Sequence, residues 1–131
     1  MKSKELKVIQ KLAKVKKSIR TVDYEYSRFD AIDEKNIYEV KCRDKFYEDV
    51  LIEFDKFSFN LMYSQIHDKD FLYVVEMDKI YIFNIKELYL FGHNFKWEWK
   101  SLHKQTEFGK TEKIKKLVGY INIEHAIYET D

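Results

Sequence analysis

The chain has 131 residues, of which 45% are apolar and 36% charged, and its net charge is +1. This length suits a single domain over residues 1–131, and the apolar content is too high for intrinsic disorder. With three glycines and no proline, the chain lacks glycine-rich nucleotide loops. No apolar run approaches the ~20 residues that span a membrane. The single cysteine allows no internal disulfide, and the cytoplasm is the expected setting.

The net charge hides an uneven distribution along the chain. Residues 1–20 carry eight Lys or Arg and one acid, residues 96–118 carry seven Lys and three Glu, and residues 21–95 have a net charge of −7. Basic ends around an acidic middle could attract a polyanion and leave the carboxylates for another purpose. A lysine-rich, solvated helix explains the same charges without any partner.

The first predicted element is an amphipathic helix over residues 4–19, because apolar residues recur there at three- or four-residue spacing. Its basic face carries Lys7, Lys11 and Lys14, which could line a nucleic-acid groove. Residues 22–43 then alternate between apolar and polar side chains around a turn at 33–36, which predicts a β-hairpin.

The register of this hairpin places two carboxylates opposite each other. If the turn is centred on Glu34 and Lys35, then Ile32 faces Ile37 and Asp30 faces Glu39. Like charges at such a pair cost stability unless a cation lies between them, and Mg²⁺ binds one or two carboxylates plus water and phosphate oxygens. One face of the hairpin then carries Arg28, Asp30, Glu39, Lys41 and Arg43, and the other, a core face, carries Phe29, Ala31, Tyr38, Val40 and Cys42.

Lys41 completes the candidate site, because it follows Glu39 by two residues and so shares its face. There it could act on an attacking water or on the charge that develops at phosphorus. Carboxylate-x-Lys is common in so charged a chain, and what distinguishes Glu39 and Lys41 is the strand and the facing carboxylate. The alternative is a solvated hairpin face with cross-strand ion pairs such as Asp30 with Lys41.

Beyond the hairpin, helical spacing predicts a helix over residues 46–66, and β-rich runs at 71–76 and 80–83 predict a second hairpin. A short helix is expected near residues 86–90. In the tail, Trp97 and Trp99 could stack on bases while Lys96, Lys100 and Lys104 contact phosphates, although alternating tryptophans are more often half buried. The apolar segment at 114–123 fits no element clearly, so the tail is expected to be irregular.

Several segments together resemble a PD-(D/E)XK nuclease over roughly residues 4–90, in particular a small stand-alone member of that superfamily. They are residues 28–33, residues 38–43, the helical segment 51–57 and the paired strands 72–75 and 80–83. The resemblance implies an α/β fold with a restriction-endonuclease-like core, in which helices flank a central mixed sheet, in the order α-ββ-α-ββ followed by the tail. Small members of this kind often resemble proteins of phages and other mobile elements.

The resemblance also implies a role for each matching residue. Asp30 and Glu39 match the two metal-binding carboxylates, and Lys41 matches the catalytic lysine. Glu5 matches an accessory carboxylate on the first helix, and Lys56 matches a polar position that supports the site, with Glu53 a weaker match. No proline precedes Asp30, a deviation that is common in this divergent group.

The sequence therefore predicts a nuclease that hydrolyses phosphodiester bonds in DNA with Mg²⁺ or Mn²⁺, an endonuclease with selectivity for DNA structure. A homodimer is the partner that follows from relatives that cut both strands, and no membrane partner is expected. The alternative is a catalytically inactive protein of the same fold, a nucleic-acid or protein-binding module of a mobile element. The residues expected to contact nucleic acid are Lys7, Lys11, Lys14, Arg28 and Arg43.

Overall fold

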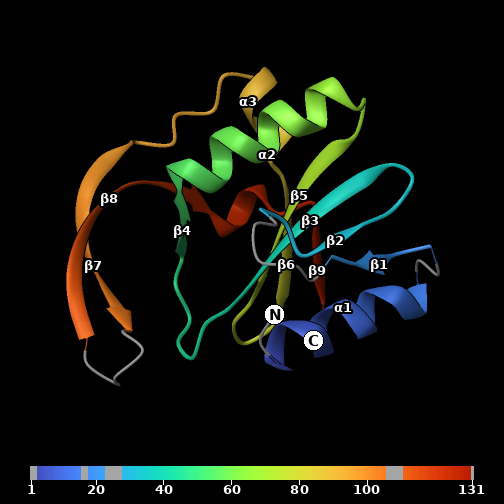
Figure 1. The fold of residues 1–131 in the computed structure, drawn as a ribbon, viewed down its shortest axis with the longest axis horizontal. Helices are drawn as coiled ribbons and strands as arrows, with labels where there is room; N and C mark the ends of the chain where they lie inside the picture. The colour runs from blue at the N-terminus through green and yellow to red at the C-terminus, as the bar shows by residue number, and fades with distance from the viewer. Residues whose placement is uncertain (1–2, 16–17, 23–27, 106–110, 131) are drawn as a thin grey trace.

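The computed structural model describes residues 3–15, 18–22, 28–105 and 111–130 (Figure 1). Its helices are α1 (Ser3–Val15), α2 (Phe54–Ile66) and α3 (Ile85–Leu90), with a 3-10 turn, η1 (Ile123–His125). Its strands are β1 (Arg20–Thr21), β2 (Ala31–Ile32), β3 (Asn36–Cys42), β4 (Asp49–Glu53), β5 (Asp70–Glu76), β6 (Ile80–Asn84), β7 (Glu98–Gln105), β8 (Thr111–Asn122) and β9 (Tyr128–Thr130).

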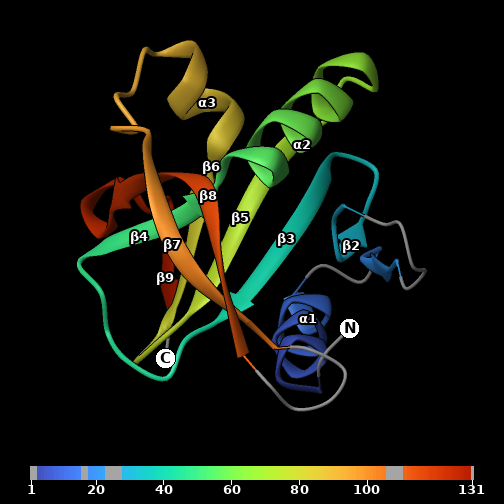
Figure 2. The same cartoon turned by 60° about the vertical axis from the view of Figure 1, so that its left-hand side comes forward.

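The described strands form two sheets. Sheet A has the order β1-β2-β3-β5-β6-β9, and sheet B has the order β4-β8-β7. Within sheet A, β3 and β5 are parallel and joined through α2, whereas the other neighbouring strands are antiparallel. Helix α1 lies on one side of sheet A and α2 on the other, and sheet B projects beside α2 (Figures 1 and 2). The predicted α/β class with a central mixed sheet is confirmed.

The register predicted for the first hairpin is also confirmed. Ala31 pairs with Tyr38 and Ile32 pairs with Ile37. The second hairpin is antiparallel, as expected, and α3 coincides with the predicted short helix. Residues 23–27, which the predicted first hairpin includes, lie outside the described residues.

Three predicted elements differ from the structure. The first helix ends at Val15 instead of residue 19, with residues 16–17 outside the described part. The helix predicted over 46–66 begins only at Phe54, because residues 49–53 form β4. The tail is not irregular, since it contributes β7 and β8 to sheet B and β9 to the edge of sheet A.

Apolar side chains cover both faces of sheet A. On the α1 side, Ala31, Tyr38 and Val40 pack with Val8 and Ile9. The α2 side holds a second cluster that includes Ile37, Phe71, Tyr73, Phe83 and Phe57 of α2. Phe29 is buried as predicted but on the other face: it belongs to the α2-side cluster and contacts the ring of Tyr63, because it precedes β2 and does not follow its alternation.

Sheet B is held against α2 by a close approach of β8 to an aromatic cluster. Trp97, just before β7, contacts the rings of Phe54, Phe57 and Phe95. A Cβ atom at Gly119 would lie only 2.8 Å from the Trp97 ring, so only glycine permits this packing without a shift. Trp97 is thus half buried, whereas Trp99 keeps 70% of its surface exposed.

The turn between β2 and β3 is fixed by a buried polar network. The Asp33 carboxylate accepts hydrogen bonds from the backbone N–H groups of Lys35 (2.8 Å) and Asn36 (2.7 Å) and from the Tyr38 hydroxyl. The Lys69 ammonium donates to the carbonyl of Asp33 at 2.6 Å. Because the turn sets the register, this network also determines which β3 residue lies opposite Asp30.

We expect Tyr38→Phe to lower the free energy of unfolding by about 1–3 kcal/mol, because it removes a donor from a buried carboxylate. Tyr128→Phe is the matched control, since Tyr128 is 48% exposed and its substitution should change stability by less than about 0.5 kcal/mol. Urea denaturation of both variants measures the difference. Equal midpoints would show that the Tyr38 hydroxyl contributes nothing to the turn.

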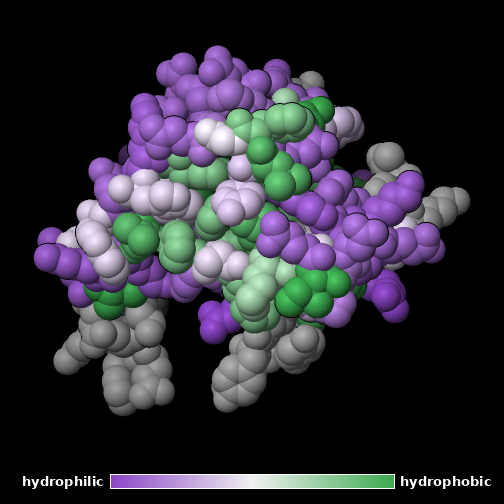
Figure 3. All heavy atoms as spheres, turned by 90° about the horizontal axis from the view of Figure 1, so that it is seen from above, coloured by the Kyte–Doolittle hydropathy of each residue, from purple (hydrophilic) through white to green (hydrophobic). Residues whose placement is uncertain are grey.

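Apolar side chains also reach the surface on α2 and α3. Met62, Leu90 and Phe91 expose 51%, 63% and 87% of their surfaces. Apolar residues are visible among hydrophilic ones when the molecule is seen from above (Figure 3). A cavity of about 520 Å³ on this side is lined by Phe57, Phe95 and Trp97 among others. Among the described residues, no helix has the length and apolar character needed to cross a bilayer.

Candidate active site

Glu39 lies at the centre of the candidate site, in the middle of β3. Only 2% of the residue is exposed, and its Oε2 atom is buried with no hydrogen-bond partner among the described residues. Two ammonium groups approach its other oxygen, Oε1: Lys41 Nζ at 3.6 Å and Lys56 Nζ at 4.0 Å. A buried carboxylate with one unsatisfied oxygen lowers the free energy of unfolding, so stability does not explain why an acidic residue occupies this position.

Asp30 is held beside Glu39 by the backbone of the hairpin. Its carboxylate accepts a hydrogen bond from the Val40 N–H at 2.8 Å, and its own N–H donates to the Tyr38 carbonyl at 2.7 Å. The carboxylate therefore lies over β3, and the pairing of β2 with β3 places Asp30 opposite Glu39.

Burial is the main cause that raises the pKa of Glu39 from 4.5 to about 8, and the negative charge of Asp30 is the next. Lys56 and Lys41 oppose this rise, and the charge of Glu5 on α1 adds to it. The carboxylates of Asp30 and Glu5 thus both act on the carboxylate of Glu39, in a site that also holds two lysines. A divalent cation bound here would offset the repulsion among these carboxylates.

The residues present fit a hard divalent ion. Among the described residues, no three His, Cys, Asp or Glu side chains converge to form a complete ligand set. Mg²⁺ needs no such set, because it keeps several waters and takes one or two carboxylates together with phosphate oxygens. The unsatisfied Oε2 of Glu39 and the adjacent Asp30 carboxylate supply that smaller set.

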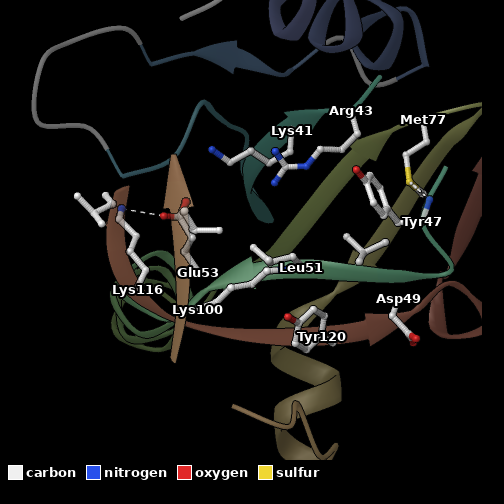
Figure 4. Close-up of a pocket in the computed structure, with 13 residues that line it drawn as sticks. Lys41, Arg43, Tyr47, Asp49, Leu51, Glu53, Met77, Lys100, Lys116 and Tyr120 are labelled. Atoms are coloured by element: carbon white, nitrogen blue, oxygen red, sulfur yellow. Dashed lines mark hydrogen bonds and ion pairs between the residues drawn. The ribbon is translucent and has the colours of Figure 1, made fainter. Parts of the chain in front are cut away.

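Lys41 connects this carboxylate pair to a cavity of about 550 Å³. Lys41 and Arg43, at the end of β3, extend from one side of it (Figure 4). Sheet B provides the opposite wall, with Leu51 and Glu53 from β4 and with residues of β7 and β8. The cavity thus lies between the two sheets.

The cavity wall of sheet B includes two lysines whose placement the sequence did not predict. Lys100 comes from β7 and Lys116 from β8, and the two are direct partners across the strands. Lys100 was expected in a basic tail, but Lys116 lies in a segment without a clear pattern. The side chain of Lys104 lies outside the residues described in full.

Tyr73 ties the two walls together. Its side chain is buried on β5, where it is the parallel partner of Glu39. Its hydroxyl donates to the Leu51 carbonyl of β4 at 2.8 Å. This contact connects β5, the neighbour of the strand that carries Glu39, to β4 at the edge of sheet B.

The remaining predicted contact residues do not line this cavity. Lys7, Lys11 and Lys14 are exposed on α1, and Lys11 lies 3.9 Å from Glu76 at the end of β5. Arg28 is exposed, with its guanidinium 5.8 Å from the centre of the Phe59 ring. Of the five contacts predicted on the first helix and hairpin, the structure brings only Arg43 to the cavity, where Lys100 of the tail also lies.

No family model and no curated protein sequence matches this chain. Among solved structures, it is similar to a Holliday junction resolvase from the archaeal hyperthermophile Archaeoglobus fulgidus. The two share 13% sequence identity and a TM-score of 0.54, over 98% of this chain and 92% of the resolvase. The chain therefore has the restriction-endonuclease-like fold of that resolvase, the fold that the resemblance to PD-(D/E)XK nucleases implied.

Proposed function

We propose that this protein is a divalent-metal-dependent endonuclease that hydrolyses phosphodiester bonds in DNA and selects its substrate by structure. The observation that carries this proposal is Glu39, a buried carboxylate with an unsatisfied oxygen, adjacent to Asp30 and in contact with a lysine that lines a basic cavity. A solvated hairpin face does not account for it, since Glu39 is 2% exposed.

In the proposed mechanism, Asp30 and Glu39 hold Mg²⁺ or Mn²⁺, which when bound would acidify a water molecule and neutralise phosphate charge. Glu39 gives up its proton when it takes up this role, because a carboxylate binds cations only when ionised. Lys41 directs its ammonium at the phosphate and stabilises the charge that develops there. Lys56 reaches Glu39 from α2 and orients it, and Glu5 contributes negative charge from α1.

The similar structure is that of a Holliday junction resolvase, which supports branched DNA as the first substrate to test. A nuclease that cuts two strands of a junction works well as a homodimer, and we propose that this chain forms one. The exposed apolar residues on α2 and α3, including Met62, Leu90 and Phe91, support this. The cytoplasm is the proposed setting, since the single cysteine, Cys42, allows no internal disulfide.

We expect the wild-type protein to cut a four-way DNA junction with Mg²⁺ or Mn²⁺ and to be inactive in EDTA. Linear duplex of the same sequence is the control for structural selectivity and should be cut more slowly. Denaturing gel electrophoresis of end-labelled strands measures both rates and maps the cut positions. Binding of the junction without cleavage in any metal would favour the inactive binding module, and equal rates on the two substrates would contradict the selectivity.

A further inference from the structure

Two lysines face each other across sheet B on the side that lines the cavity. Lys100 and Lys116 are direct partners on β7 and β8, and both line the cavity that Lys41 reaches from the other wall. Like charges at directly opposed positions destabilise a sheet. An anion bound between them would offset this cost.

The cavity carries more positive charge than its own carboxylates neutralise. Its cations are Lys41, Arg43, Lys100 and Lys116, and its carboxylates are Asp49 and Glu53. Asp49 accepts a hydrogen bond from Asn122 at 3.1 Å and lies at the start of β4, at the opposite end of the strand from Glu53. The Lys116 ammonium is 2.7 Å from the Glu53 carboxylate, its main partner, and 3.9 Å from that of Asp55, and both raise the pKa of Lys116, so it stays charged.

Lys100 is directed into the cavity by Tyr120, which also lines it. Its ammonium lies 5.9 Å from the centre of the Tyr120 ring, a cation–π contact. The Tyr120 hydroxyl donates to Glu98 at 2.7 Å, which holds the ring in place. No salt bridge to Lys100 is found among the described residues, so its charge is available to a ligand.

We propose that Lys100 and Lys116 form a subsite for a backbone phosphate of the DNA, one that flanks the phosphate cut at Lys41, with Glu53 as an internal competitor for Lys116. This subsite rests on the proposed nuclease function. Incoming phosphate takes the place of the Glu53 carboxylate at Lys116, and the strand then lies between β3 and sheet B. Because phosphates carry no sequence information, the subsite positions any DNA strand.

The test is the affinity of the protein for a four-way DNA junction in EDTA, measured by fluorescence anisotropy over a range of salt concentrations. Lys100→Gln should weaken binding about three- to tenfold at 0.1 M salt and reduce the salt slope by about one. Lys115→Gln is the matched control, because Lys115 is exposed and lies on the opposite face of β8 next to Lys116. It should change neither quantity.

Glu53→Gln gives an effect of the opposite sign. Removal of the competitor should tighten binding severalfold, which a purely structural role of Glu53 would not do. Thermal unfolding completes the set: Lys100→Gln should not lower the melting temperature, because it relieves a like-charge pair. Equal affinities of Lys100→Gln and Lys115→Gln, or weaker binding by Glu53→Gln, would overturn the subsite.

These measurements separate the subsite from the nuclease function. Affinity is measured in EDTA, and cleavage in Mg²⁺ is measured independently on the same junction. If the affinities of the wild type and the variants follow the predicted ranking but the wild type never cuts, the subsite is supported and the nuclease function is contradicted. A wild-type protein that cuts, with Lys100→Gln indistinguishable from Lys115→Gln, would do the reverse.

Discussion

Glu39→Gln should abolish metal-dependent cleavage and, in the same variant, raise thermal stability at alkaline pH. Glutamine has nearly the shape of glutamate but cannot offer a carboxylate to a divalent ion, so cleavage should fall by at least about 100-fold. The gain in stability follows from the burial of the same group, which is 2% exposed. Loss of function together with gain of stability marks a residue kept for its chemistry.

The gain depends on pH in a defined direction. In the unfolded chain Glu39 ionises near its ordinary pKa of 4.5, whereas in the folded protein burial and Asp30 raise the pKa to about 8. Below pH 4.5 Glu39 is protonated in both states and does not affect stability. As the pH rises from 4.5 to 8, the free energy of unfolding of the wild type falls by a few kcal/mol in all. Glutamine is uncharged throughout, so the advantage of the variant grows over this window and is constant above it.

Scanning calorimetry in EDTA at pH 5, 7 and 9 measures this advantage. Glu34→Gln is the matched control, because Glu34 is exposed in the neighbouring turn and its substitution should affect neither cleavage nor the pH dependence. Addition of Mg²⁺ should narrow the gap at pH 9 by stabilising only the wild type. A melting difference that is the same at all three pH values would contradict the buried, uncompensated carboxylate.

Lys41→Gln should lower the cleavage rate about 100- to 1,000-fold, far more than it weakens DNA binding, since its ammonium acts on charge that develops in the transition state. Single-turnover rates with saturating protein measure the chemical step, and binding in EDTA measures affinity. Cleavage that survives the substitution would remove Lys41 from the mechanism.

Lys56 provides a closely matched control for Lys41. The two ammonium groups lie 3.6 and 4.0 Å from the same Glu39 oxygen, and both side chains are 26% exposed. Lys41 lines the cavity, whereas Lys56 is not among its lining residues. If lysine serves only to neutralise Glu39, the two Gln variants should be equally impaired. If Lys41 acts on the phosphate, Lys56→Gln should cost roughly tenfold at most.

The parts of the fold that follow from local pattern were predictable. The hairpin register followed from alternation around a short turn, and the central sheet from β-rich runs around a helix. β4 was missed because Val50 and Leu51 fall at helical spacing from Phe54, so the strand pattern merges with that of α2. Only the pairing of β4 with β8 distinguishes the two, and that contact is far apart in sequence.

The end of the chain was not predictable for a different reason. β8 places charged Lys116 on the cavity side and charged Lys115 on the other, so the apolar alternation of a strand is broken where the cavity needs a cation. The carboxylate pair was accessible from the sequence because both residues belong to one hairpin. The cavity was not, because its second wall also requires β7 and β8, which lie more than fifty residues beyond the hairpin.

The long-range pairing in sheet B has a consequence for the order of folding. Asp49 at the start of β4 and Asn122 at the end of β8 are hydrogen-bonded partners that lie 73 positions apart in the chain. The hairpin that carries Asp30 and Glu39, in contrast, closes over a four-residue turn. Loop-closure entropy therefore favours early formation of the hairpin and late docking of β8 onto β4. We therefore expect the two carboxylates to come into register before the wall with Lys100 and Lys116 forms, and the cavity between the sheets to be completed last.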